Sequence, residues 1–472
     1  MFVSAVLAKA EENTSAPAAA TIPAAFPMPA HYFGLELERS QYFWGGRGTH
    51  DEDGHLSLSK ANLQSMMAHL VDLYLEPWMG VNHSASAPAS SNTTLASTPV
   101  TTFTSADFDD LELELRTNAI RVQIFDGQVM YRDVCNVSMQ QEFKATRSIG
   151  QLRIFQHIAT RLRSTNRRIE FFVSYLDHPK FTDNSMTNGR LHNFPYFALH
   201  STPRAYSDIL VPDPLDIGDR YDSKKNGNRP IPYGDRIDKV FFRGSFSPFK
   251  PFGKDLWSNG RVRAHKLGDQ FPHLFDTGLV SISSSRLGPF ANFSEMMGYI
   301  NSIPRAKTDI GEANKYKFQL DVDGGLGSGR AVNILKSGSV LLKVMSPFQQ
   351  FADPLLIPFK HYIPVDQHMH YLVPIVKWCI ENPTLMETIT RNAVEFASQF
   401  HSIDGRSLFW NILLEKYAGL MEAPHPRNKR DKDKRNRAPF EPVPENLCKK
   451  YEATRQYCPA MITCYSGWKN VP

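Results

Sequence analysis

The fold is decided by Asp321-Val-Asp-Gly-Gly-Leu-Gly-Ser-Gly-Arg330, a run of glycines that stands between apolar segments. Apolar and polar residues alternate at 316–322, before this run, as they do in a strand. Residues 331–335, after it, can form a helix. Ser337-Gly338-Ser339 ends that helix, and residues 340–344 predict a second buried strand. A strand, a glycine turn, a helix and another strand are typical of an α/β domain.

The glycine-rich turn also has the chemistry to receive a phosphate. A helix that begins on glycines presents unpaired backbone N–H groups and the positive end of its dipole. Arg330, in the first helical turn, adds a fork of donors that suits a diphosphate. The alternative is a crossover whose glycines only let the helix pack closely on the sheet, since their spacing matches neither common phosphate-loop pattern.

The order of the predicted elements extends this unit to a whole domain. From 239 to 400 the chain predicts strand, helix, strand, glycine turn, helix, strand and helix, which is typical of a doubly wound α/β domain. A chain of 472 residues is too long for one core, so we expect two domains. The predicted organisation is a disordered lead at 1–30, a first domain at 31–238 with a flexible insert at about 82–104, a second domain at 239–400, a helix at 401–425 that braces the first domain, and a basic, cysteine-containing tail at 426–472.

Composition and charge favour a soluble globular protein and give little support to nucleic-acid binding. Hydrophobic residues make up 42% of the chain and charged residues 21%. The formal net charge is +5, and much of the excess positive charge lies at 427–437. Asp431 and Asp433 reduce the positive charge of that run, and it has no aromatic residues on which bases could stack. We therefore expect a solvated linker there and no nucleic-acid partner.

The signals for a cellular compartment are mixed. No segment is apolar for long enough to span a bilayer, and residues 1–10 make a poor signal peptide. Three of the five cysteines crowd into the last 25 residues, which favours a disulfide-tied tail in an oxidising lumen. Glycosylation sequons would also fit secretion, at Asn13, Asn82, Asn92, Asn136 and Asn292.

Two further predicted strands end in residues that can carry chemistry. Residues 169–176 predict a strand buried on both faces, and Asp177 follows it. An acid at the carboxyl end of a parallel strand lies where α/β proteins bind ligands, although a turn-forming Asp before Pro179 is the alternative. Residues 239–242 predict another buried strand, which runs into Arg243-Gly244-Ser245.

Four stretches together resemble a known family. They are Lys239-Val-Phe-Phe-Arg-Gly-Ser245, the glycine turn that ends at Arg330, Ser337-Gly-Ser339, and Pro358-Phe-Lys-His-Tyr-Ile-Pro-Val365. In this order and at these spacings they resemble glycosyltransferase family 90, which holds the capsule-associated-type glycosyltransferases and the Rumi-like protein O-glucosyltransferases. The resemblance covers roughly 110–415.

The resemblance implies a GT-B-like architecture, in which two Rossmann-like doubly wound domains face each other across a cleft. It implies an inverting enzyme that moves glucose or xylose from a UDP-sugar to a hydroxyl of a protein or glycan acceptor. The second domain would hold the nucleotide sugar and the first would hold the acceptor. Neither a cofactor nor a metal is expected, and the lumen of the endoplasmic reticulum or Golgi is the expected compartment.

Carried over residue by residue, the resemblance assigns each candidate site residue a role. Asp177 matches the base that takes the proton of the acceptor hydroxyl. Phe246–Phe252 stand where the family has small polar residues and an early arginine, so Arg261 competes with Arg263 for that arginine's role. The substrate-binding residues are Arg243, Gly244, Ser245, Arg263, Gly325, Leu326, Gly327, Ser328, Gly329 and Arg330.

Three alternatives stay open. Asp321-Val-Asp323 after a strand can hold Mn²⁺ against a nucleotide diphosphate, as in metal-dependent transferases of the other common architecture. His361, His368 and His370 suggest a zinc site, although no Cys or Glu set accompanies them. The third alternative is a non-catalytic relative that keeps the fold and binds carbohydrate or protein without turnover.

Overall fold

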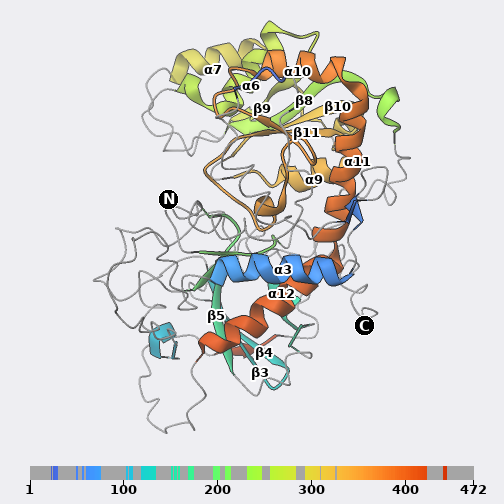
Figure 1. Ribbon diagram of the computed structural model, residues 1–472. Coiled ribbons are helices and arrows are strands. Elements are labelled where there is room, and N and C mark those ends of the chain that lie inside the picture. The colour runs from blue at the N-terminus through green and yellow to red at the C-terminus, as the bar shows by residue number, and fades with distance from the viewer. Residues whose placement is uncertain are drawn as a thin grey trace, which may run out of the picture.

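The computed structural model has two β-sheets, one above the other in Figure 1. The upper sheet is built from the second half of the chain, and the lower sheet mainly from the first half. The structure describes residues 23, 25–29, 49–50, 56–57, 60–75, 103–104, 106–109, 119–133, 150–152, 154–156, 158–159, 168–174, 195–201, 208–213, 231–246, 256–282, 293–303, 305–308, 310–324, 327–421 and 440–443.

Among the described residues, the second sheet has five strands, and every neighbouring pair is parallel. They are β8 (Ile237–Phe246), β9 (Phe275–Ile282), β10 (Tyr316–Asp321), β11 (Val340–Val344) and β12 (Ile363–Val365), in the order β12-β11-β10-β8-β9. The chain runs from β8 outward to β9 and then returns to β10 on the other side of β8. This order is that of a doubly wound fold, and it confirms the predicted α/β class.

Helices connect these parallel strands. The glycine turn leads into α9 (Arg330–Ser337), between the two strands that the sequence predicts on either side of it. α6 (Gly260–Gln270) begins after Asn259, whose side chain accepts from the backbone N–H groups of Arg261 and Val262. The remaining helices of this half are α7 (Phe293–Ser302), α8 (Ile310–Ala313), α10 (Leu372–Glu381) and α11 (Pro383–Phe400), with 3₁₀ turns at Tyr233–Asp235, Leu256–Ser258 and Asp353–Leu355.

The first sheet is mixed. Its strands are β3 (Ala119–Phe125), β4 (Gln128–Asp133), β5 (Ile169–Ser174), β6 (Tyr196–Ala198), β7 (Ile209–Leu210) and β13 (Glu441–Pro442), in the order β13-β4-β3-β5-β6-β7. β5, β6 and β7 are parallel, whereas β3 pairs with β4 and β5 in the antiparallel sense. The hairpin turn Asp126-Gly127 has φ values of 49° and 71°, which suit a two-residue turn and explain why β3 and β4 are antiparallel. A small antiparallel pair, β1 (Thr49–His50) and β2 (Leu56–Ser57), lies outside both sheets.

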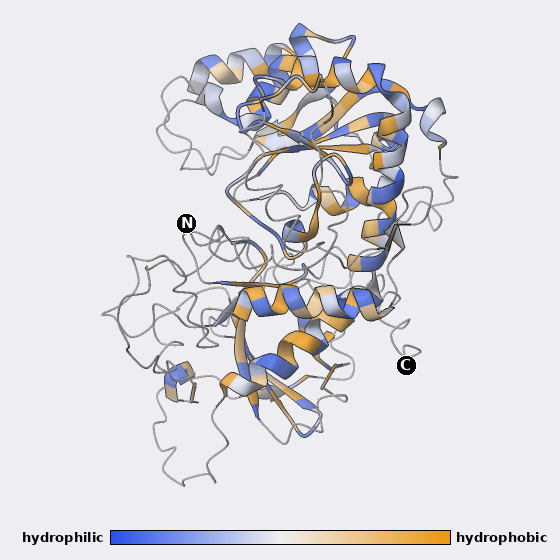
Figure 2. Cartoon of the chain, in the orientation of Figure 1, coloured by the Kyte–Doolittle hydropathy of each residue, from blue (hydrophilic) through white to orange (hydrophobic). Residues whose placement is uncertain are grey.

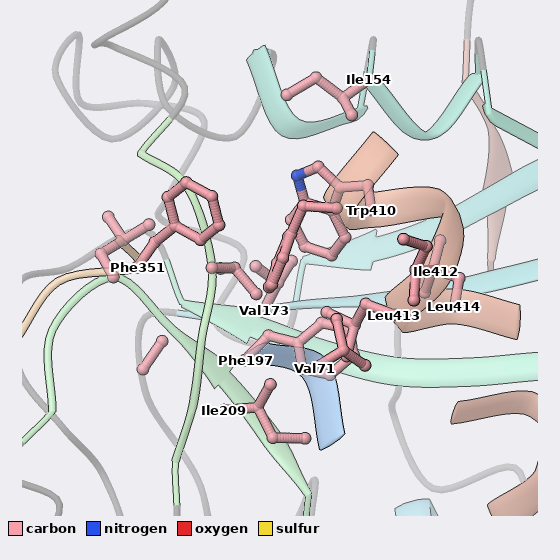
Figure 3. Packing of buried hydrophobic residues seen from close by; sticks show 14 of the residues in the cluster. Val71, Ile154, Val173, Phe197, Ile209, Phe351, Trp410, Ile412, Leu413 and Leu414 are labelled. Carbon is pink, nitrogen blue, oxygen red and sulfur yellow. The ribbon is translucent and has the colours of Figure 1, made fainter. Parts of the chain in front are cut away.

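Two helices complete the first sheet. α3 (Lys60–Leu75) and α12 (Ile403–Tyr417) lie side by side against it, and α12 is followed by a 3₁₀ turn at Ala418–Leu420 (Figure 1). Trp410 of α12 is fully buried, with its ring 5.0 Å from that of Phe155 and 5.6 Å from that of Phe197. Figure 3 shows Trp410 in one cluster with Phe197 and with Phe351 from the second half.

Apolar residues concentrate in the strands of both sheets, and α3 and α11 carry both polar and apolar residues (Figure 2). One cluster of buried side chains runs from the first sheet to residues Ala331, Ile334 and Leu335 of α9. The two halves therefore share part of their core. Among the helices that the structure describes, none has both the length and the apolar character needed to cross a bilayer.

Described segments near the two ends of the chain pack against the two halves of the molecule. Within the lead predicted at 1–30, the Phe26 ring packs edge-on against Phe359 at 4.7 Å and Trp378 at 5.0 Å. Within the tail predicted at 426–472, β13 pairs with the edge strand β4. The sequons, the cysteines other than the buried Cys379, the basic run at 427–437 and most of the insert at 82–104 lie outside the described residues.

Candidate ligand site

The carboxyl ends of β8 and β10 meet where the second sheet reverses its strand order. The two strands are parallel neighbours, with Val240 opposite Phe318. β8 ends through Arg243-Gly244-Ser245, and β10 continues through Val322 into Asp323 and Gly324. In open α/β sheets, ligands bind in the crevice outside such a switch point.

Arg330 ties the glycine turn to the end of β8. Its Nη2 donates to the carbonyl oxygen of Arg243 at 3.1 Å, and its Nη1 donates to that of Val322 at 3.4 Å. The guanidinium also lies over the Phe242 ring, 4.7 Å from the ring centroid. The first residue of α9 thereby places its positive charge at the switch point, beside the amino end of the helix.

A second guanidinium, that of Arg261, lies at the same place. Its Nε donates to the carbonyl oxygen of Asp323 and its Nη1 to that of Ser245, both at 2.8 Å. A Cβ on Gly324 would lie 2.7 Å from Arg261 Nη2, so glycine permits this close approach. Burial, followed by the positive charge of Arg330, lowers the pKa of Arg261. An anion bound beside both guanidinium groups would relieve their mutual repulsion.

Arg263 faces another direction from Arg261. Its Nη1 donates to the carbonyl oxygen of His368 at 2.8 Å. Successive residues of a helix turn by about 100°, so side chains two positions apart lie on nearly opposite faces. Of the two arginines that the sequence leaves in competition, the structure therefore brings Arg261 to the switch point and directs Arg263 elsewhere.

The side chain of Arg243 belongs to a contact between strands. Its Nη2 lies 2.6 Å from Asp276 Oδ1 on β9, and its Nη1 donates to the Asp276 carbonyl at 2.7 Å. Burial would raise the pKa of Asp276, but hydrogen bonds from Tyr316 and Arg243 outweigh burial and lower it. Arg243 therefore contributes its carbonyl oxygen to the switch point, while its guanidinium holds β8 to β9.

A group of charged side chains lies next to the turn. Lys343 Nζ on β11 lies 3.7 Å from Asp321 and 3.5 Å from Asp353. Burial would lower the pKa of Lys343, but these carboxylates outweigh it and raise the pKa. Ser346 donates a hydrogen bond to Asp323, and burial raises the pKa of Asp323 to about 6. Both carboxylates of the Asp-x-Asp motif thus have partners within the protein.

The three histidines of the zinc alternative have separate surroundings. His361 is buried, and its Nδ1 accepts from the backbone N–H of Ile357 at 3.0 Å. His370 Nδ1 lies 3.4 Å from Asp366 Oδ2, and the His368 and His370 rings are 5.5 Å apart. In the part of the chain that the structure describes, no group of three His, Cys, Asp or Glu side chains is arranged to hold a metal ion.

The predicted base and part of the predicted donor loop lie outside the described residues. These are Asp177, Gly325 and Leu326; β5 ends at Ser174, three positions before Asp177. A hollow beside the amino end of α9 is lined by both halves of the chain. Its lining residues are Leu199, His200, Val211, Pro212, Asp213, Gly329, Gln350, Phe351, His401 and Arg406. His200 and Gln350 reach the glycine turn there, and no sequence pattern singles out either residue.

Comparisons with known proteins give partial matches. Human Protein O-glucosyltransferase 3 is 24% identical over 197 residues, which make up 41% of this chain and 34% of that protein. Uncharacterized protein 035R of Invertebrate iridescent virus 3 is 26% identical over 170 residues, 35% of this chain and 15% of that protein. Protein O-glucosyltransferase 2 of Danio rerio is 28% identical over 106 residues, 22% of this chain and 21% of that protein. The matches therefore span about a third or less of the length of these relatives.

A solved structure and a family model were also matched. The crystal structure of Anabaena HepE in complex with UDP-glucose shares 16% sequence identity, with a TM-score of 0.27 over 44% of this chain and 53% of that chain. The model of the family described as Glycosyl transferase family 90 matches residues 105–437, which include the glycine turn, both switch-point strands and α12. On that match, the chain belongs to glycosyl transferase family 90.

Proposed function

We propose that this protein is an inverting glycosyltransferase that moves glucose or xylose from a UDP-sugar to a hydroxyl of a protein or glycan acceptor. Membership of the family supports sugar transfer, and the names of the human and Danio rerio relatives point to glucose and to a protein acceptor. The observation that carries the proposal is the convergence of Arg261 and Arg330 at the switch point, beside the amino end of α9. A UDP diphosphate has the charge and shape that this group fits.

In the proposed reaction, Asp177 acts as the general base. It takes the proton of the acceptor hydroxyl while the hydroxyl oxygen attacks the anomeric carbon. The bond from that carbon to the diphosphate oxygen breaks on the opposite face, which inverts the configuration and releases UDP. Negative charge develops on the diphosphate, where Arg261, Arg330 and the backbone N–H groups of the turn would stabilise it. The Ser245 hydroxyl is proposed as a further donor to a phosphate oxygen.

The first experiment is a UDP-release screen over several UDP-sugars, with and without a chelator. We expect turnover with UDP-glucose or UDP-xylose and no loss of rate with the chelator, since the arginines supply the positive charge. Loss of turnover on chelation would instead favour a metal held at Asp321 or Asp323. Release of no UDP from any UDP-sugar, with any protein or glycan acceptor, would contradict the proposal.

The second experiment substitutes the proposed base. Asp177→Asn should reduce kcat by about 10²–10⁴-fold and leave UDP binding within about twofold, because it removes proton transfer and little else. Asp404→Asn, which changes an exposed carboxylate in the first turn of α12, is the matched control and should keep wild-type activity. A wild type that binds UDP without turning over any UDP-sugar would favour the non-catalytic carbohydrate- or protein-binding alternative.

The lumen of the endoplasmic reticulum or Golgi is the proposed compartment, on the family resemblance. The sequons predict the test, since only a chain that enters that lumen receives N-linked glycans. We expect the protein, expressed in a eukaryotic cell, to shift to lower apparent mass after treatment with an N-glycosidase. No shift, together with a cytosolic location by fractionation, would contradict the proposed compartment. It would not contradict the proposed reaction.

A further inference from the structure

The glycine turn is in contact with the first half of the chain. His200, two residues beyond β6, lies against Gly327: a Cβ at Gly327 would come within 2.8 Å of His200 Nε2 and closer still to Cδ2. The φ angle of Gly327 is outside the left-handed region. Glycine is therefore required at this position by the volume of the histidine ring, and the backbone conformation would accept alanine.

Gln350, in the loop after β11, joins the same contact. Its Nε2 donates to the carbonyl oxygen of Ser328 at 2.5 Å and lies 3.0 Å from His200 Nε2. An amide nitrogen can only donate, so the His200 ring nitrogen accepts this second hydrogen bond. One side chain thus holds both a carbonyl of the turn and a ring from the other half of the molecule.

The loop that carries Gln350 is itself fixed on the first half. Gln349 and Ser201 exchange two backbone hydrogen bonds, from Ser201 N to Gln349 O at 3.1 Å and from Gln349 N to Ser201 O at 2.8 Å. The Tyr74 hydroxyl of α3 donates to the Phe351 carbonyl at 2.7 Å. The Gln350 backbone is therefore held on both sides by residues of the first half, and its side chain points back to the turn.

We propose that His200 and Gln350 are positioning residues, which hold residues 327–330 of the glycine turn in the shape that binds the donor diphosphate. The proposal rests on the function proposed above. The hydrogen bond from Gln350 fixes Ser328 through its carbonyl oxygen. The Ser328 Oγ in turn accepts from the backbone N–H of Arg330 at 3.3 Å, so the start of α9 is fixed as well. Donor affinity then depends on the first half being seated against the second, and loss of either side chain loosens the turn.

A double-mutant cycle tests the contact between His200 and Gly327. UDP affinity is measured by calorimetry for wild type, Gly327→Ala, His200→Ala and the double variant. We expect Gly327→Ala to weaken binding by about tenfold, because its methyl group displaces the ring or the turn. In the His200→Ala background the same substitution should cost less than about threefold, since the space is then open. If the loss of UDP affinity in the double variant equals the product of the losses in the two single variants, the proposal is overturned.

A substitution at Gln350 tests the hydrogen bonds without a clash. Gln350→Met keeps length and volume but removes both bonds, and should raise the KM for the UDP-sugar by about three- to tenfold with kcat nearly unchanged. Gln399→Met is the matched control, because that half-buried glutamine donates to Glu395 within α11. A Gln350→Met enzyme with wild-type KM, or with only kcat reduced, would overturn the positioning role.

The outcomes separate this inference from the proposed function. A wild type that binds no UDP and turns over no UDP-sugar contradicts the function, and the positioning role falls with it. A wild type that binds UDP, with independent effects of Gly327→Ala and His200→Ala, contradicts the positioning role alone. Thermal unfolding shows whether each variant is folded; if Gly327→Ala is not, the Gln350→Met measurement decides.

Discussion

At the scale of single residues, the start of one helix decides which arginine faces the switch point. Arg261 and Arg330 both donate to the carbonyl oxygen of Val322, each at 3.4 Å, whereas Arg263 donates to His368. The Asn259 cap sets the first turn of α6 and hence the direction of each arginine. The sequence leaves the two arginines in competition, because residue spacing across Phe246–Phe252 carries no information about that direction.

We predict that Arg261→Met weakens UDP binding by about tenfold to hundredfold. Hydrogen bonds to a charged group are worth about 1.5–3 kcal/mol, which corresponds to that range in Kd. Arg263→Met is the matched control and should change Kd by less than about threefold. Isothermal calorimetry with UDP measures both variants. A larger loss in Arg263→Met than in Arg261→Met would reverse the assignment.

The Asp323 carboxyl should make stability depend on pH. Burial, with the nearby Asp321 adding to it, raises its pKa in the folded protein to about 6 from an ordinary value of 3.8. The folded state therefore binds the proton more tightly, so this group stabilises the protein below the unfolded pKa and loses that contribution as pH rises through about 6.

Asp323→Asn should consequently raise the melting temperature relative to wild type at about pH 8, where the native carboxyl is charged, and lose that advantage near pH 4. Thermal unfolding of both proteins across this range provides the measurement. Asp269→Asn is the control, since it removes an exposed carboxylate that accepts from Tyr299. A Tm difference that is constant with pH, or that grows on acidification, would contradict this account of Asp323.

At the scale of elements, the periodic spacing of apolar residues predicted the strands next to the glycine turn and the helix between them. The predicted strand at 340–344 matches β11, and the predicted helix at 331–335 lies within α9. β13 could not be predicted, because two residues have no period and their partner strand β4 lies about 300 positions earlier. His200 and Gln350 are isolated polar residues in loops. Their contact depends on tertiary structure, so it could not be predicted from the sequence either.

The packing of α12 on the first sheet gives a test of its core. Trp410 is fully buried, and within the described residues its Nε1 has no hydrogen-bond partner. Trp410→Ala should lower the free energy of unfolding by about 3–5 kcal/mol through the cavity it leaves. Trp410→Phe should cost less than about half of that, because it keeps a ring and removes an unsatisfied N–H.

Urea unfolding measures both Trp410 variants. Leu408→Ala on the same helix is the control, since that side chain is only partly buried against the cluster. Equal losses in Trp410→Phe and Trp410→Ala would contradict this account, in which the volume of the aromatic ring stabilises the packing.

At the scale of the whole molecule, the shared apolar core makes the two halves one cooperative structure. Ala331, Ile334 and Leu335 of α9 belong to the same cluster as the side chains of the first sheet. The helix that follows the glycine turn therefore cannot leave the first half without exposing apolar surface. Movements that admit the proposed donor are then expected in the loops around the switch point.

We predict a single unfolding transition for the whole chain. Calorimetry should give a calorimetric enthalpy equal to the van't Hoff enthalpy, and Trp410→Ala should shift the transition as a whole. Independent halves would instead unfold in two steps, with Trp410→Ala lowering only one of them. Two resolved peaks in the wild type would contradict a shared core.

The late position of α12 and β13 in the chain also has a consequence for biosynthesis. A ribosome delivers β3 to β6 long before it reaches Trp410 and Tyr417, whose rings cover Phe155, Phe171 and Phe197. Until then these rings lack their contacts with Trp410 and Tyr417, and the outer edge of β4 has no neighbour from β13. We therefore expect the first sheet to complete its packing only after α12 and β13 have been synthesised, with these apolar rings exposed to aggregation in the meantime.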